Sequence, residues 1–91
     1  MFEIKIQKRA IDSITKTVKY ISEDNIFYAN QVQEYIYKSI KLLENFPLLW
    51  ILKESWYRII IEPKYKFKIV YRIKENIVYI VWVYREQKSW K

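Results

Sequence analysis

The sequence predicts an α+β domain in the order β-α-α-β-β-β, with a helical hairpin packed on one face of a small antiparallel sheet. Two observations support this prediction. Apolar residues alternate with period two at the N-terminus, recur three and four apart through residues 10–46, and return to short β-rich runs from residue 57. The chain has 91 residues, which suits one hydrophobic core, so we expect a single domain over residues 1–91.

The first half of the chain predicts a strand and two helices. Residues 2–7 alternate apolar and polar side chains, as a half-buried strand does. From about residue 9 to residue 21, apolar residues stand three and four apart, which indicates an amphipathic helix. The polar break at residues 22–25 offers N-cap residues for a second helix, which we expect Pro47 to end. A break this short predicts an antiparallel helical hairpin.

The second half of the chain predicts three strands. Residues 48–56 follow no clear period, and we expect a loop there. Strands are expected over residues 57–62, 66–73 and 77–84, followed by a polar tail. Pro63 and Lys64 predict the first turn, and residues 74–76 predict a tight hairpin connection with Asn76 in the left-handed conformation.

The composition excludes several classes of function. The chain has no His, Cys or Gly, so it cannot form a Ser-His-Asp triad, a thiolate nucleophile, a zinc finger or a P-loop. We expect no metal and no cofactor. The longest apolar run, with Tyr left out of the count, covers only residues 48–52, and no signal peptide is recognisable at the N-terminus. We therefore expect a cytoplasmic protein that does not enter a membrane.

Positive charge is concentrated in the second half of the chain. The net charge is +7, and residues 47–91 hold ten basic and four acidic side chains. In the middle strand, apolar residues alternate with basic ones, so we expect a basic face turned away from the helices: Lys66, Lys68 and Arg72 opposite Phe67, Ile69, Tyr71 and Ile73. Arg58 is expected on the same open side. Parity places Trp82 and Tyr84 on one face with Val78 and Ile80, without fixing which side of the sheet that is.

A bare basic face with aromatic residues suits a polyanion, since Lys and Arg neutralise phosphates and rings stack on bases. The same charges would also keep an open sheet soluble and discourage edge pairing. The charge pattern alone does not separate these two interpretations.

Three stretches of the chain resemble the RelE/ParE superfamily of toxins from type II toxin–antitoxin systems. They are Lys8-Arg9-Ala10 leading to Tyr20-Ile21-Ser22-Glu23-Asp24-Asn25, then Ile40-Lys41-Leu42-Leu43-Glu44-Asn45-Phe46-Pro47, and the three strands with Tyr57-Arg58-Ile59, Tyr65 to Ile73 and Ile80 to Trp90. The resemblance spans nearly the whole chain in order and spacing. It implies a toxin that arrests growth and forms a hetero-oligomer with a cognate antitoxin protein.

The resemblance leaves the mechanism open. RelE-like members cleave mRNA on the ribosome, which requires a base, an acid and cations around the phosphate. For that reaction the resemblance implies Lys68, Arg58, Arg72 and Arg85 as catalytic residues, and Lys64, Lys66, Lys88, Trp82, Tyr84 and Trp90 as nucleic-acid-binding residues. ParE-like members instead trap DNA gyrase and need no catalytic residue. We favour mRNA cleavage over gyrase inhibition, because gyrase binding predicts no cationic cluster; a non-toxic, basic nucleic-acid-binding module is the third possibility.

Overall fold

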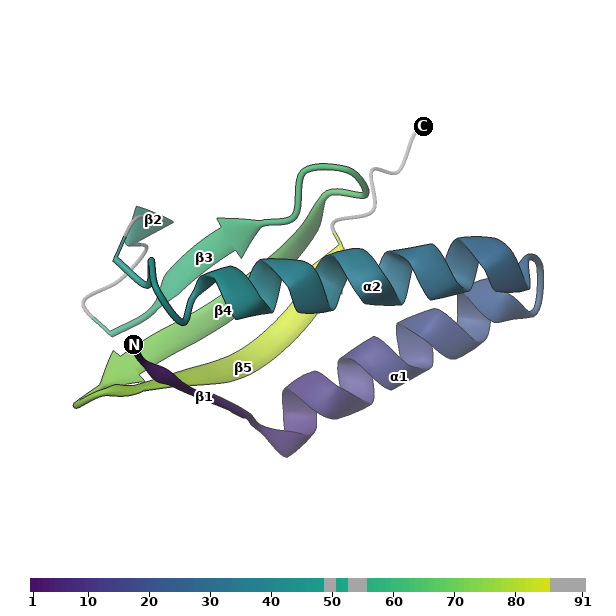
Figure 1. The fold of residues 1–91 in the computed structure, drawn as a ribbon. Helices are drawn as coiled ribbons and strands as arrows, with labels where there is room; N and C mark the ends of the chain where they lie inside the picture. Colours follow the sequence, from purple (N-terminus) through teal and green to yellow (C-terminus); the bar gives the residue numbers. More distant parts are fainter. Residues whose placement is uncertain (49–50, 53–55, 86–91) are drawn as a thin grey trace.

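The computed structural model describes residues 1–48, 51–52 and 56–85, and it confirms the predicted order of helices and strands (Figure 1). Both helices lie on one face of the sheet, and no helix or strand of the described residues covers the other face. The elements are β1 (Glu3–Ile6), α1 (Lys8–Ser22), α2 (Ile26–Leu42), β2 (Ile51–Leu52), β3 (Arg58–Ile61), β4 (Phe67–Lys74) and β5 (Ile77–Arg85). Within the described residues, no helix is both long and apolar enough to span a membrane.

The two helices form the expected hairpin, and α2 ends earlier than predicted. Asn25 caps α2, because its side-chain oxygen accepts a hydrogen bond from the backbone N–H of Tyr28 at 3.1 Å. The helix ends at Leu42 and not at Pro47. The N–H of Leu43 bonds the carbonyl of Ile40, three residues back, so the last turn tightens and the chain leaves the helix there.

The sheet has the strand order β1-β5-β4-β3-β2 and is mixed. The prediction of a wholly antiparallel sheet is wrong for β1, which pairs parallel to β5, with Ile4 opposite Val78. The other three pairings are antiparallel. A tight turn forces antiparallel pairing, whereas β1 and β5 are joined through the rest of the chain, and that long connection permits the parallel arrangement.

A short strand, β2, lies in the segment that we expected to be a loop. Its two residues pair with β3, with Ile51 opposite Ile59 and Leu52 opposite Arg58. Two residues are too few to produce a recognisable alternation, so the sequence pattern could not reveal this strand.

The β4–β5 hairpin has a two-residue loop, since Lys74 pairs with Ile77. The left-handed residue in this loop is Glu75, with φ 59°, and the expectation that Asn76 would adopt that conformation is wrong. Hairpins of this length take a positive φ at both central residues or only at the first. Here only the first position requires it.

A bulge in β5 changes the faces of its last residues. Val70 of β4 pairs with Trp82 and Tyr71 pairs with Ile80, so Val81 is an extra residue on β5. As a result Val83 lies on the core face with Ile80, whereas Trp82 and Tyr84 lie on the opposite face. The prediction that Trp82 and Tyr84 share a face with Ile80 is therefore wrong, because the extra residue interrupts the alternation of side chains between the two faces of the strand.

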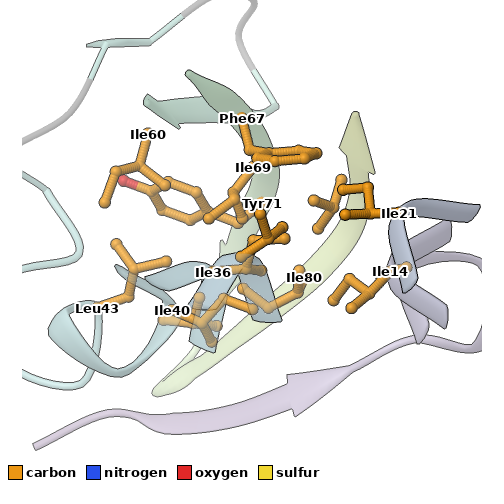
Figure 2. Packing of buried hydrophobic residues seen from close by; sticks show 14 of the residues in the cluster. Ile14, Ile21, Ile36, Ile40, Leu43, Ile60, Phe67, Ile69, Tyr71 and Ile80 are labelled. Carbon is orange, nitrogen blue, oxygen red and sulfur yellow. The ribbon is translucent and has the colours of Figure 1, made fainter. Parts of the chain in front are cut away.

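The hydrophobic core fills the space between the hairpin and the covered face of the sheet (Figure 2). Tyr71 is the largest fully buried side chain, and it packs there with Phe67 and Ile69 of the same strand. The helices contribute the facing residues Ala10, Ile14, Ile21, Ala29, Val32, Ile36 and Ile40, joined by Leu43 just after α2. The alternation of β4 therefore predicted its core face correctly.

Candidate binding surface

The open face of the sheet carries basic and aromatic side chains at neighbouring register positions. Lys68 pairs with Tyr84, and its ammonium nitrogen lies 6.0 Å from the centre of the Tyr84 ring. Arg72 pairs with Tyr79, and its guanidinium lies 5.6 Å from the centre of that ring. Cations over ring faces are attracted by the ring quadrupole. The predicted open-face positions of Lys68 and Arg72 are confirmed.

The aromatic part of this face surrounds a concavity of about 260 Å³. The rings of Trp82 and Tyr84 lie 4.9 Å apart, and the guanidinium of Arg9 stacks over the Trp82 ring at 4.4 Å. The lining is mostly apolar: Arg9, Trp56, Tyr57, Ile59, Val70, Val81, Trp82 and Tyr84. The concavity therefore offers ring faces and aliphatic groups, with cations at its margin.

Arg9 reaches this face because α1 continues along the edge of β5 where β1 ends. The N–H of Gln7 donates to the carbonyl of Ile80 at 3.0 Å, and six residues later the hydroxyl of Ser13 accepts from the N–H of Val83 at 3.4 Å. The start of α1 thus supplies hydrogen-bond partners to the part of the β5 edge that β1 does not cover. Sequence reasoning missed Arg9 as a site residue, because helical periodicity gives no signal for a side chain that reaches across a sheet edge. It missed Trp56 because that residue lies in a segment without a clear period, just before β3.

Two of the four predicted catalytic residues lie on the helix side of the sheet. Arg58 pairs with the buried Tyr71, and its guanidinium donates a hydrogen bond to the Leu48 carbonyl at 3.4 Å. Arg85 pairs with Phe67, and its guanidinium lies 4.9 Å from the centre of that core ring. The expected open-side position of Arg58 is wrong, because the register places it opposite Tyr71 and directs it toward the segment after α2.

The remaining predicted site residues are scattered. Lys64 lies on the helix side, with its ammonium nitrogen 4.9 Å from the centre of the Tyr35 ring. Lys66 precedes β4 and has a φ of 66°, so the alternation of the strand does not extend to it. Lys88 and Trp90 lie outside the described residues. Among the described residues, no group of three or more acidic side chains gathers as a metal site would require.

The comparisons with known proteins identify the family. A family model described as the ParE toxin of the type II toxin–antitoxin system, parDE, matches residues 4–90. The chain belongs to the ParE toxin family. Among solved structures it is similar to a chain from the chromosomal ParDE toxin–antitoxin system of P. aeruginosa, with a TM-score of 0.82 over 96% of this chain and 98% of that chain, at 15% identity. No curated protein matches it.

This ParE family member also has a groove on its helical layer. The groove has a volume of about 510 Å³ beside the C-terminal half of α2, and Leu42 and Phe46 on its wall are 49% and 50% exposed. Tyr35 also lines the groove, and its ring already packs edge to face against the ring of Tyr65, with 5.6 Å between the ring centres. Two large exposed apolar side chains in one groove are typical of a surface that a partner covers.

Proposed function

We propose that this ParE family toxin arrests growth by binding its target, DNA gyrase, and not by cleaving RNA. The observation that carries the proposal is the division of the four predicted catalytic cations between the two faces of the sheet. Lys68 and Arg72 occupy the open face, whereas Arg58 and Arg85 are turned to the helix side. This arrangement supports a binding surface over a catalytic centre.

RNA cleavage through the 2′-hydroxyl needs a base and several cations around one phosphate, within hydrogen-bond reach of it. Lys68 and Arg72 are four residues apart on one strand, which separates their Cα atoms by roughly 13 Å. Arg58 and Arg85 are separated from both by the thickness of the sheet. A single phosphate cannot contact this set, so the ribonuclease interpretation that the charge pattern favoured loses its geometric support.

A binding toxin requires a contact surface and no proton transfer. The aromatic concavity between Trp56, Trp82 and Tyr84 has the composition of a protein-binding centre, because Trp, Tyr and Arg are enriched at such centres. We place the target contact there. The helical groove at Leu42 and Phe46 lies on the helix side of the sheet, and we propose that the antitoxin binds there.

The test compares two assays on the same purified protein. We expect inhibition of DNA supercoiling by gyrase and no ribosome-dependent cleavage of mRNA. Expression of the chain alone in a bacterium should stop growth, with DNA-damage signalling preceding any loss of protein synthesis. Cleaved mRNA with unaffected supercoiling would overturn the proposal in favour of the ribonuclease mechanism, and normal growth with folded protein present would remove the toxin function altogether.

A further inference from the structure

The outer side of α1 forms a second concavity, next to the one in which we place the target contact. It has a volume of about 540 Å³ and is lined by Lys8, Arg9, Asp12, Ser13, Lys16 and Trp82. Arg9 and Trp82 also line the open-face concavity, so the two hollows share one wall. We call the surface formed by Lys8, Arg9, Lys16 and Trp82 the basic edge.

We propose that the basic edge binds the sugar–phosphate backbone of a nucleic acid. This proposal goes beyond the proposed function, because it concerns nucleic acid that the toxin binds directly, in the absence of gyrase. Three cations from the first three turns of one helix line a single hollow, and two more, Lys68 and Arg72, follow on the adjoining open face. Successive cations along a surface match the regular spacing of phosphates in a nucleic-acid strand.

The charges on this surface are not fully balanced by acidic residues. Within the hollow, Asp12 is the acidic lining residue, and its carboxylate pairs with the ammonium of Lys8 at 3.3 Å. Arg9 is stacked on Trp82, which fixes its guanidinium beside the hollow without neutralising it. The net positive contribution of the basic edge therefore comes from Arg9 and Lys16.

A nucleic acid fits this surface better than an acidic protein segment does. The Trp82 ring is 38% exposed between the cations, and a ring in that position provides a stacking face for a base. The hollow is lined largely by charged and polar side chains, and Trp82 supplies its only ring among the described lining residues. A protein segment would require the apolar anchor sites that the open-face concavity supplies and this one does not.

The experiment measures binding of the purified toxin, without gyrase, to labelled duplex DNA, single-stranded DNA and single-stranded RNA of equal length by fluorescence anisotropy. We expect binding that weakens with salt, with a log–log slope of about −2 to −4 for contacts with three or four phosphates. Lys16→Ala and Arg9→Ala should each reduce the slope by about one unit and weaken binding several-fold at low salt. The three probes distinguish a duplex from a single strand as the source of the phosphates.

Two further variants make the result specific to the basic edge. Lys38→Ala removes the same charge from α2, where Lys38 is paired with Glu34, and it should leave binding unchanged. Asp12→Asn removes the negative charge from the hollow and should tighten binding several-fold. Equal effects of the Lys16 and Lys38 substitutions would mean that only net charge matters, and absence of binding to all three probes would overturn the inference. Neither result would bear on gyrase inhibition, which is measured separately.

Discussion

Tyr71 shows how a single residue connects the sheet to the segment that follows the helices. Its side chain is fully buried in the core, and its hydroxyl donates a 2.6 Å hydrogen bond to the carbonyl of Pro47. Burial raises the pKa of Tyr71 to about 12, because a phenolate would lose its hydration, and the nearby Arg58 cation partly opposes this. The neutral hydroxyl is therefore the form that the fold stabilises.

This pKa predicts a loss of stability at alkaline pH. An unfolded tyrosine ionises near pH 10, whereas the folded one remains protonated to about pH 12. The contribution of Tyr71 to folding is thus fully present below pH 10 and is lost as the pH rises through 12, by roughly 2–3 kcal/mol in total. Urea unfolding at pH 9 and pH 11 should show about half of this loss for the wild type, because pH 11 lies midway between the two pKa values, and a smaller loss for Tyr71→Phe. An equal loss in both proteins would contradict the assignment to Tyr71.

At the scale of elements, the turn between β3 and β4 depends on one buried carboxylate. Glu62 is fully buried, and its two oxygens accept the N–H groups of Lys64 and Tyr65, each at 2.7 Å. The backbone of Glu62 also bonds Lys66 and Phe67, which closes the turn. Glu62 thus organises the turn in which Lys66 takes its positive φ.

We expect Glu62→Ala to lower the free energy of unfolding by about 1–3 kcal/mol, because two partly buried N–H groups lose their acceptors. Glu62→Gln keeps one acceptor oxygen and should cost less. Chemical denaturation of both variants measures the difference, and Glu75→Ala, at the exposed β4–β5 turn, serves as a control expected to change stability by under about 1 kcal/mol. A Glu62→Ala variant as stable as that control would show that the turn forms without the carboxylate.

The elements also show which features the sequence could predict. Alternation located β1 and β4, β-rich apolar runs located β3 and β5, and the apolar stripes located both helices, because each pattern extends over several residues. The faces of Trp82 and Arg58 could not be predicted. The first depends on the extra residue at Val81, and the second depends on the register of β3 against Tyr71. Both are set by pairing between strands, which a single-strand pattern does not contain.

At the scale of the whole molecule, the fold separates its surfaces. The open face carries the aromatic concavity and two of the predicted cations, while the helical layer carries the groove at Leu42 and Phe46. A toxin that must be held inactive and later released needs a partner surface as well as a target surface. We infer that the groove is the partner surface, because it has the larger exposed apolar area and lies away from the open face.

The inference predicts a toxin that escapes its antitoxin. Leu42→Asp places a carboxylate in the groove, where Leu42 is half exposed, so the fold should be retained. Loss of an apolar anchor of about 2 kcal/mol or more weakens a complex at least roughly 30-fold. Co-expression with the cognate antitoxin should therefore rescue growth for the wild type and not for Leu42→Asp, while both arrest growth when expressed alone.

The matched control for this prediction is Ile11→Asp, which places the same charge at a similarly exposed apolar position on α1, outside the groove. We expect the antitoxin to neutralise Ile11→Asp as it does the wild type, and co-purification should report the same difference between the two variants. If Leu42→Asp is neutralised as well as Ile11→Asp, the antitoxin binds elsewhere. If Leu42→Asp is folded but no longer toxic, the groove contacts the target and the open face becomes the surface on which to seek the antitoxin.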